Sequence, residues 1–597
     1  MYRKIHIILG FLSFFIPFIL YVYTMAPTTS FWDCGEFIAT SFILGVPHPP
    51  GSPLFLLLGN VFSNIPIFND IGARINLISP LVSAFSVMFL YLIIVQLIEE
   101  FNGKSEDTSN LIINNISAFL AALTFAVTDS HWFNAVEAEV YSLSTFFTAI
   151  MLWMILKWSS LSKESWNIRY LLLIAYMIGL ATGIHILNLL TLPFISLIIY
   201  FKKYNYSFKS LLIVMFLTLI VFIMIYSGII LGLPDIVSKF NSLYIIILGI
   251  GVVILSIIFL HVSSFKTSLL PYAKLISVFA IIFITLTVYN KLFIKSIDDI
   301  SNDFSNQLTT IDETFILYLN QQEGDQSDNY KNLDYEYIEK LKKERAIILK
   351  KEKIFEKKKD KMQFLGLIFW QSIEVSLGLI LLFIGVPIFL YMFLYRDKNN
   401  IVQLPLKVFL LSFLLIVIGY SSYTTIFIRA NQHPRINENN PDNLDRALSY
   451  INRDQYGAIQ SFNPSSAIGS STGGHWRRWT NDKNNPTLSE QINFVWNYQI
   501  KEMYLRYFAW QFIGRSDKTS DKAWSVNDLN GDPVGNRNLD GVDFFRYGFP
   551  LVFLFGLLGI YSHFRNDWKR ALAVLSVFLA TGLMLVLYLN QYDPQPR

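Results

Sequence analysis

The sequence predicts an all-α membrane protein that crosses the bilayer many times, and two observations support this fold class. First, 53% of the 597 residues are hydrophobic and 16% are aromatic, with a mean hydropathy of +0.42, which is more apolar surface than a water-soluble fold buries. Second, many runs of about 20 mostly apolar residues, long enough to cross the hydrocarbon, alternate with short charged loops. The net charge of +4 is too small to indicate a nucleic-acid partner. The single cysteine, Cys34, excludes a disulfide within the chain.

Hydropathy predicts about 13 spans. They are expected at residues 5–25, 75–97, 111–128, 142–158, 170–184, 186–200, 211–231, 243–261, 270–290, 366–394, 404–422, 547–563 and 571–590. The first run could pass for a signal peptide, but no convincing small-residue cleavage site follows it, so we expect it to remain as the first span. The apolar stretch at 52–65 is too short to cross the bilayer and predicts a re-entrant or interfacial helix.

The charge of the loops predicts the orientation. The short loops rich in Lys and Arg all fall on one side of the membrane, at residues 1–4, 157–169, 200–209, 395–400 and 563–570. The positive-inside rule places that side in the cytoplasm, together with the N-terminus. By parity, the stretch at 26–55, the loop at 128–139 and two long polar segments lie on the other side.

The spans and loops divide the chain into five parts. They are a membrane-embedded catalytic module at 1–290, a charged extracytoplasmic helical segment at 291–365, further spans at 366–422, an extracytoplasmic domain at 423–546 and C-terminal spans at 547–597. The charged segment has apolar residues at helical spacing and predicts an exposed helix or helical hairpin. The domain at 423–546 has many turn residues and many aromatic residues to bury, so we expect a small folded region of mixed structure.

Two carboxylates stand out in the stretch APTTSFWDCGEFIATSFILGVPHPPGSPLF, residues 26–55. Asp33 and Glu36 are three positions apart, so on a helix they would share a face and could converge on one polar group. A local alternative is a capping box, in which Ser30 caps the helix and Asp33 is at its third position. Capping leaves Glu36 and the HPPG turn at His48 unexplained, so both interpretations of Asp33 stay open.

Proton abstraction is the chemistry that this position suits. A carboxylate at the membrane surface, partly desolvated and flanked by a second carboxylate, is expected to have its pKa raised toward the range of a general base. A hydroxyl group would be its natural partner. We therefore expect Asp33 to act as the base, Glu36 to orient Asp33 or the acceptor, and His48 to line the site.

Further candidates lie in the next outer loop and at a break between spans. In DSHWFNAVEAEVYSL, the side chains that could join the site of Asp33 or hold a metal are those of Asp129, His131, Glu137 and Glu139. Taken singly, acids near a helix start in a solvated loop are the simpler interpretation. His185 lies between two short spans and could serve a site, although a satisfied core histidine is the commoner outcome.

Arginines on the outer side could bind a phosphate, because guanidinium groups match phosphate oxygens. Arg74 follows the opening stretch, and Arg429 lies just beyond a span and is the first candidate. Others accompany aromatic residues and are expected to be ordinary interfacial anchors: Arg477, Arg478, Arg506 and Arg515. The stretch MYLRYFAWQFIGR predicts an amphipathic helix on the bilayer surface. Because no nucleotide-binding motif is present, we expect an energised substrate to arrive through the lipid.

Four segments, WDCGEFIATSFILGVPHPPGSPLF, NAVEAEVYSL, GLATGIHILNLL and IRANQHPRINENNPDN, resemble a family of multi-pass bacterial membrane proteins that is abundant in Bacteroidota. That family is grouped with the eukaryotic transmembrane protein O-mannosyltransferase, in glycosyltransferase family 117 of the glycosyltransferase-C superfamily. The opening segment is the most specific part of the resemblance, and the similarity is densest over residues 15–200.

The resemblance implies a glycosyltransferase-C-type helical bundle in a bacterial inner membrane, with its active site on the periplasmic face. It implies an inverting transfer of a sugar, mannose in relatives, from a polyprenyl phosphate to Ser or Thr of exported proteins. Asp33 matches the catalytic acid of the first outer loop, Glu36 its companion, and His48 the HPPG turn. Cys34 replaces a small residue of the family pattern. The implied partners are membrane lipids, the lipid-linked sugar and exported acceptor proteins; no cofactor is assigned, and a divalent metal is not favoured.

Two other functions stay open. The same fold could glycosylate a lipid or an envelope polymer, which the sequence does not separate from a protein acceptor. A transporter or flippase is the alternative from another class, since transporters commonly have repeated halves and ionisable groups near the bilayer midplane. Here the acids cluster in outer loops, with Glu374 as the main exception, and no repeat is evident.

Overall fold

The computed structural model describes residues 2–103, 107–161, 167–231, 303–314, 316, 335–362, 400–456, 460–471, 475–516, 541–546 and 549–592. The chain forms two compact units, one made of Met1–Asp235 with Ile401–Arg597 and the other of Ile236–Asn400. The described residues are helical, with two isolated β-bridges and no sheet. The protein is therefore all-α where it is described, as predicted, but the regions of mixed structure expected outside the membrane contain no sheet there.

Eight helices among the described residues are long and apolar enough to cross a membrane. They are Lys4–Thr24, Ile71–Phe101, Ser109–Ala126, Val140–Ser160, Ile186–Lys203, Phe208–Leu231, Leu411–Ala430 and Leu551–Leu589. The predicted spans at 243–261, 270–290 and 366–394 lie outside the described residues, and so does Glu374. These helices make the chain a multi-pass membrane protein.

The helices of the first 231 residues begin with α1 (Tyr2–Thr24), α2 (Cys34–Ile43), α3 (Pro53–Ser63), α4 (Ile71–Asn76), α5 (Ile78–Asn102), α6 (Thr108–Ala126) and α7 (Asp129–Ala135). They continue with α8 (Val140–Ser160), α9 (Ile168–Thr182), the 3-10 helix η2 (Ile186–Thr191), α10 (Leu192–Lys203), α11 (Phe208–Ile223) and the π-helix η3 (Met224–Leu231). At 15 residues, α9 is shorter than the eight candidate spans, although a span was predicted there. The predicted interfacial stretch at 52–65 forms α3.

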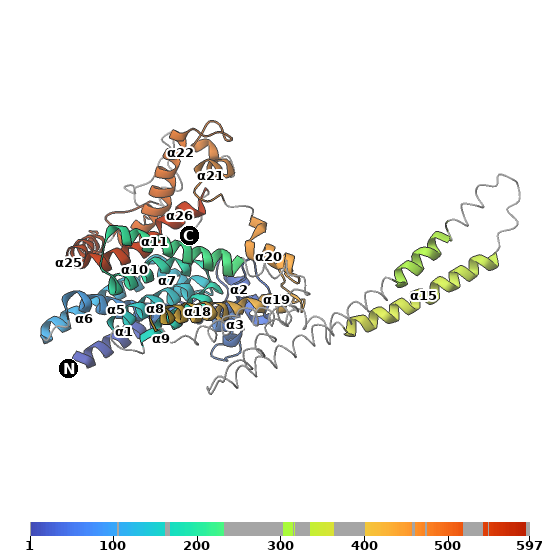
Figure 1. The fold of residues 1–597 in the computed structure, drawn as a ribbon, viewed down its shortest axis with the longest axis horizontal. Helices are drawn as coiled ribbons and strands as arrows, with labels where there is room; N and C mark the ends of the chain where they lie inside the picture. Colours follow the sequence, from blue (N-terminus) through green and yellow to red (C-terminus); the bar gives the residue numbers. More distant parts are fainter. Residues whose placement is uncertain are drawn as a thin grey trace. The chain divides into compact units, whose positions relative to one another are not determined.

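The helices α1, α5, α6 and α8 pack side by side (Figure 1). Three small residues of α6, all alanines, face the core of this group and allow the helices to approach closely. Polar side chains add hydrogen bonds between helices: the Tyr21 hydroxyl donates to the Ala126 carbonyl at 2.6 Å, and the Tyr91 hydroxyl donates to Asn115 at 2.7 Å. Such bonds satisfy polar groups that lipid cannot satisfy.

Two glycines bring a distant helix, α18 (Asn400–Tyr420), against α9. A Cβ at Gly179 would lie 2.1 Å from the Ile416 carbonyl oxygen, and a Cβ at Gly419 would lie 2.5 Å from the Leu180 nitrogen. Only glycine therefore permits this crossing. It brings the segment after α18 back to the N-terminal helices.

The remaining helices of this unit are short except at the C-terminus. They are α19 (Thr424–Ala430), α20 (Leu444–Asn452), α21 (Pro464–Ser470), α22 (Leu488–Phe494), the π-helix η9 (Val495–Arg506), α23 (Tyr507–Phe512), α25 (Leu551–Thr581) and α26 (Leu583–Leu589). The amphipathic surface helix predicted at 503–515 is wrong at Arg506, which is buried and pairs with the buried Glu502 at 2.7 Å. Arg506 and Arg515 both stack on Trp510, at 4.2 and 4.3 Å from its ring centre.

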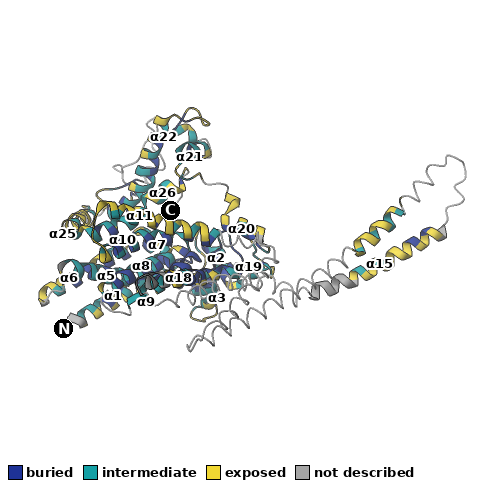
Figure 2. Cartoon of the chain, in the orientation of Figure 1, coloured by how far each residue is buried: buried dark blue, intermediate teal, exposed yellow. Residues whose placement is uncertain are grey.

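The second unit contains helix α15 (Tyr335–Met362) and a helix at 303–314. The Arg345 guanidinium pairs with the Asp312 carboxylate at 2.7 Å, so the two helices contact each other. Figure 2 shows that most described residues of α15 are exposed. Its side of the membrane stays a prediction.

Candidate active site

Asp33 lies immediately before α2, which begins at Cys34. Its backbone occupies the N-cap position, but its side chain makes no capping hydrogen bond. The chain turns sharply just before it, since Trp32 has a φ of +61°. The capping box built on Ser30 is therefore wrong: the helix starts one residue after Asp33 and not before it. No described residue donates a hydrogen bond to the Asp33 carboxylate, which is exposed.

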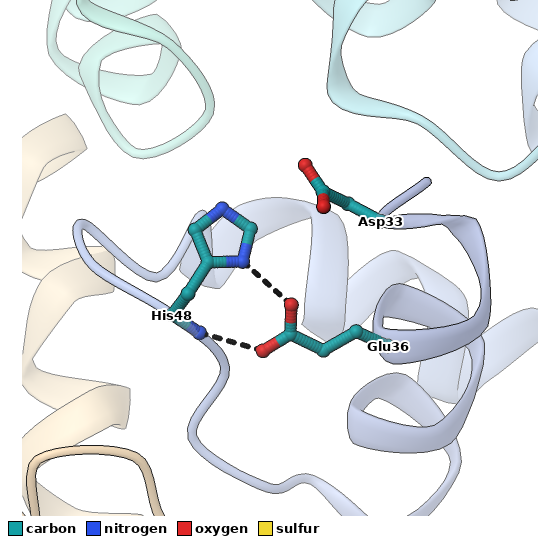
Figure 3. A group of neighbouring side chains, drawn as sticks. All are labelled: Asp33, Glu36 and His48. Carbon is teal, nitrogen blue, oxygen red and sulfur yellow. Dashed lines mark hydrogen bonds and ion pairs between the residues drawn. The ribbon is translucent and has the colours of Figure 1, made fainter. Parts of the chain in front are cut away.

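Glu36 and His48 form a pair across the turn that follows α2. The backbone N–H of His48 donates to Glu36 Oε1 at 2.7 Å, and His48 Nδ1 lies 2.6 Å from Glu36 Oε2. Both side chains are about a quarter exposed, at 23% for Glu36 and 25% for His48. In Figure 3 the Glu36 carboxylate faces His48, while Asp33 lies beside the pair with no bond to either residue. The structure thus brings together the three residues that the opening stretch singled out.

The pairing decides the direction of both pKa shifts. Burial alone would raise the pKa of Glu36, but the hydrogen bonds from the His48 side chain and backbone outweigh it, so the pKa of Glu36 is lowered. The hydrogen bond to Glu36 raises the pKa of His48 against the effect of burial, with help from the charges of Glu36, Asp33 and Glu438.

A metal is not needed to explain this group. One ligand atom from each of Asp33, Glu36 and His48 lies within 4.8 Å of the other two. Glu36 and His48, however, direct those atoms at each other at ion-pair distance. The geometry supports an ion pair beside an open carboxylate, and we assign no metal ligand.

A segment almost 400 residues away holds the turn in place. Val46 and Asn437 form a parallel β-bridge, in which the Val46 N–H donates to the Ile436 carbonyl at 2.9 Å. The Tyr450 hydroxyl donates to the Pro47 carbonyl at 2.6 Å. A Cβ at Gly51 would lie 2.5 Å from the Tyr450 oxygen, and Gly51 has a φ of +93°, so this contact requires glycine. We call residues 426–450 the clamp segment.

Backbone strain is concentrated in the same two regions. Of the nine non-glycine residues with positive φ in the described chain, seven lie at 32–52 or 433–453: Trp32, Leu44, Ser52, His433, Asn439, Asn440 and Arg453. Such conformations cost free energy and cluster where a fold positions functional groups. The strained residues therefore mark the turn at 32–52 and the loops at 433–453 as regions that position functional groups.

Asn76 joins the opening stretch to the following outer loop. Its side-chain amide donates to the carbonyls of Ala26 and Thr28 at 2.8 and 2.7 Å, and its oxygen accepts from the Ala138 N–H at 2.9 Å. Asn76 is fully buried. The sequence analysis missed this residue, because an asparagine at the end of a short helix carries no local signal.

Glu137 and Glu139, on either side of Ala138, are not in a solvated loop. Each is only 1% exposed. Burial first, and then the charges of these two acids, raise the pKa of the buried Cys34 thiol, which places them close to the start of α2. The expectation of a solvated loop is wrong for both acids, which are buried in the protein interior.

The two other candidate histidines occupy different surroundings. His131 is buried against the rings of Phe125 and Tyr21, at 4.3 and 5.9 Å between ring centres, and burial lowers its pKa to about 4. It is therefore a neutral core residue. His185 lies nearer the turn: its Nδ1 accepts from the Leu187 N–H, and its neighbour Ile184 accepts a hydrogen bond from Ser52.

The guanidinium groups of the two candidate phosphate-binding arginines donate hydrogen bonds to backbone carbonyls of the protein. Arg429 donates to the carbonyls of Leu44 and Ile43 at the end of α2, at 2.6 and 2.9 Å. Arg74 donates to the carbonyls of Phe68, Ser63 and Asn69. These contacts give both arginines a structural explanation.

Arg453, by contrast, was not singled out from the sequence. It is exposed, its guanidinium lies 4.9 Å from the ring centre of Tyr456, and no described residue forms an ion pair with it. Burial first, and then the positive charge of Arg453, lower the pKa of His185. Arg453 is thus an exposed cation whose charge acts on His185.

Comparison with known proteins shows what the N-terminal part of the chain is similar to. Residues 33–208 match the family profile described as "Protein O-mannosyl-transferase TMEM260 N-terminal domain". This part of the chain is related to the protein O-mannosyl-transferases. The relatives include protein O-mannosyl-transferase tmem260 of Dictyostelium discoideum, which is 30% identical over 190 residues, 30% of this chain and 21% of that protein. Mus musculus protein O-mannosyl-transferase TMEM260 is 30% identical over 120 residues, 20% of this chain and 15% of that protein.

The match to this family begins at Asp33 and contains Glu36 and His48. The clamp segment lies beyond its end at residue 208. The alignments span only 21% and 15% of the two O-mannosyl-transferases. No solved structure matches the chain.

Proposed function

We propose that this protein is an inverting glycosyltransferase that moves a sugar, mannose by analogy with its named relatives, from a polyprenyl phosphate to Ser or Thr hydroxyls of exported proteins. The relation to protein O-mannosyl-transferases supports transfer to a protein acceptor. The many apolar helices support a donor that arrives in the bilayer. The proposed location is a bacterial inner membrane, with the site facing the periplasm.

The exposed carboxylate of Asp33 is the observation that carries the proposal. It lies at the start of the family match, and no described residue hydrogen-bonds to it, so it is open to an acceptor hydroxyl. Glu36 is already bonded to His48 at both oxygens, and Glu137 and Glu139 are buried. Asp33 is thus the acid of the Asp33, Glu36 and His48 group that is exposed and forms no hydrogen bond to a described side chain.

The proposed step is a single displacement. Asp33 takes the proton from the acceptor hydroxyl, the oxygen bonds to the anomeric carbon, and the bond from that carbon to the donor phosphate breaks with its electron pair. Polyprenyl phosphate leaves, and the configuration at the anomeric carbon inverts. Glu36 and His48 pair with each other and hold the turn beside Asp33. Arg453 supplies a cation for the departing phosphate.

Sugar transfer by the purified protein tests this assignment. With a polyprenyl-phosphate mannose donor and a Ser/Thr peptide acceptor, we expect Asp33→Asn to lower the transfer rate by about 100-fold or more, as for loss of a general base. Asp129→Asn is the matched control, because Asp129 is an exposed acid of the next outer loop and lies outside the Asp33 cluster. A folded Asp33→Asn protein with near-normal rates would end the assignment. Transfer to a lipid acceptor without transfer to peptide would favour the envelope-lipid alternative.

A further inference from the structure

Tyr450, the last residue of the clamp segment, lies on α20 and contacts the turn that carries His48. Its side chain is 1% exposed, and its hydroxyl donates to the Pro47 carbonyl at 2.6 Å and, at the longer distance of 3.4 Å, to the His48 carbonyl. Burial raises the pKa of Tyr450 well above its ordinary value, so the hydroxyl keeps its proton and acts as the donor. Tyr450 therefore fixes the backbone of the turn through one short, buried hydrogen bond.

The Pro47 carbonyl and the His48 N–H belong to one peptide group. Such a group is planar and almost always trans, so its carbonyl and its N–H point in opposite directions in one plane. Tyr450 holds the carbonyl at 2.6 Å, and Glu36 Oε1 holds the N–H at 2.7 Å. Figure 3 shows the second of these bonds, from the His48 nitrogen to the Glu36 carboxylate. Rotation of this peptide group would break both bonds, so Tyr450 and Glu36 fix its orientation from opposite sides.

The two bonds also strengthen each other. A donor at a carbonyl oxygen draws electron density from the amide nitrogen, which makes the N–H of the same peptide group a stronger donor. The hydrogen bonds thus form one chain, from the Tyr450 hydroxyl through the peptide group to Glu36. Glu36 holds the His48 ring with its other oxygen, Oε2, at 2.6 Å. The orientation of the Glu36–His48 pair therefore depends on Tyr450, although Tyr450 contacts neither of the two paired side chains through its hydroxyl.

We propose that Tyr450 is a positioning residue of the active site, which orients the peptide group that keeps Glu36 and His48 paired. This inference rests on the proposed function. One ligand atom of each member of the pair lies within 4.8 Å of an Asp33 carboxylate oxygen, so a shift of the pair changes the surroundings of the base. Tyr450 lies far beyond residue 208, where the match to the family ends, and the site thereby extends into the C-terminal part of the chain. Because the Tyr450 hydroxyl bonds to backbone carbonyls, its loss slows the chemical step more than it weakens donor binding.

Two tyrosine variants separate positioning from a contribution to stability alone. Tyr450→Phe removes the hydroxyl and keeps the ring, and we expect kcat to fall about fivefold, the size of one hydrogen bond between neutral groups, with the donor KM changed less than about twofold. Tyr21→Phe is the matched control, because the Tyr21 hydroxyl is also buried and donates to a backbone carbonyl at 2.6 Å. We expect similar losses in melting temperature, with the wild-type kcat kept in Tyr21→Phe. Equal kcat losses in the two variants would overturn the positioning role.

A double-variant cycle tests the route through Glu36. Glu36→Ala removes the acceptor of the His48 N–H, so the orientation of the peptide group no longer acts on the pair. In that background we expect Tyr450→Phe to lower kcat less than about 1.5-fold, because residues that act through one another are not additive. A full fivefold loss in both backgrounds would overturn the proposal, since Tyr450 would then act by another route.

The His48 amide proton reports the contact without any sugar transfer. In protein labelled with 15N at the backbone of its eight histidines, the His48 signal is the one lost in His48→Gln. We expect it to move upfield in Tyr450→Phe, because the N–H becomes a weaker donor, and to keep its wild-type position in Tyr21→Phe. An unchanged His48 signal in Tyr450→Phe, or a wild-type kcat in that variant, overturns the positioning role alone. Absence of sugar transfer by the wild-type protein overturns the proposed function itself.

Discussion

The opening turn at 33–52 and the loop at 129–139 have the same kinds of residues but opposite surroundings. Each combines acids with a histidine before or after a short helix. In the turn, Asp33 is exposed and the Glu36–His48 pair is about a quarter exposed. In the loop, His131, Glu137 and Glu139 are all buried. Among the clustered acids and histidines of the two regions, those of the turn are therefore accessible to a substrate, whereas the loop exposes only Asp129 at its start.

The difference has a physical source in the residues around each region. The turn is held from outside by hydrogen bonds of the clamp segment to backbone carbonyls, which leave its side chains accessible. The loop is covered by packing of α1, α5 and α6, and its His131 lies among aromatic rings. Residue type alone does not distinguish a site from a core; the burial of the side chains does.

His131→Ala should have the largest effect, and on stability alone. Removing a buried ring that packs against Phe125 and Tyr21 leaves a cavity, and we expect the free energy of unfolding to fall by about 3 kcal/mol. Thermal unfolding in detergent measures it. The transfer rate per folded molecule should stay at the wild-type value, whereas His48→Ala should lower that rate with little loss of stability. A His131→Ala protein that is stable but slow, together with a His48→Ala protein that is unstable but fast per folded molecule, would contradict the contrast between turn and loop.

Asn76→Ala should have the next largest effect, because Asn76 connects the two regions. The variant removes the bonds to the Ala26 and Thr28 carbonyls and leaves the buried Ala138 N–H without its partner. We expect a loss of about 2 kcal/mol in thermal unfolding, together with slower transfer. The control is Asn64→Ala, which alters an exposed amide at the end of α3 and should cost less than about 0.5 kcal/mol. Equal losses in the free energy of unfolding for Asn76→Ala and Asn64→Ala would show that Asn76 does not connect the turn and the loop.

Breaking the Glu36–His48 pair should change activity by about tenfold. Glu36→Gln and His48→Gln each remove a charge-assisted bond, and we expect similar losses in kcat. Because the two residues act as one unit, the double variant should lose little more than either single variant. Fully multiplicative losses in this cycle would mean that the pair does not function together.

The smallest predicted effect is a pH dependence of stability. The lowered pKa of Glu36 adds stability above its ordinary value of 4.5 that is lost as the pH falls through the folded pKa. The raised pKa of His48 adds stability below its ordinary value of 6.5 that is lost as the pH rises through the folded pKa. The pair therefore contributes most between pH 4.5 and 6.5, by no more than about 1 kcal/mol. Melting temperatures of wild type and His48→Gln should converge from pH 6 to 8.5; a constant gap would contradict the pairing.

Much of the fold was predictable because each apolar run carries its own signal. The runs behind α1, α5, α6 and α8 are long and uniformly hydrophobic, and hydropathy predicted a span at each. The span predicted at 170–184 forms α9, which at 15 residues is shorter than the eight candidate spans. Hydropathy could not indicate its close packing on α18 through Gly179, because that contact depends on a partner helix far along the chain.

The candidate site was predictable only in part. The spacing of Asp33, Glu36 and His48 identified a group that the structure does bring together. The capping box failed because Trp32 takes a left-handed conformation and delays the start of α2, which no residue pattern indicated. The clamp segment was missed because its hydrogen bonds to the turn depend on a return of the chain across about 400 positions.

A structure with a bound donor analogue tests the central claim most directly. A non-hydrolysable polyprenyl phosphonate that carries mannose would be bound to the wild-type protein and its headgroup located. The account predicts the sugar beside Asp33, with space for an acceptor oxygen within hydrogen-bond reach of the carboxylate, about 3 Å, and within attacking distance of the anomeric carbon. A headgroup bound away from the turn, with Asp33 separated from the anomeric carbon by protein, would contradict it.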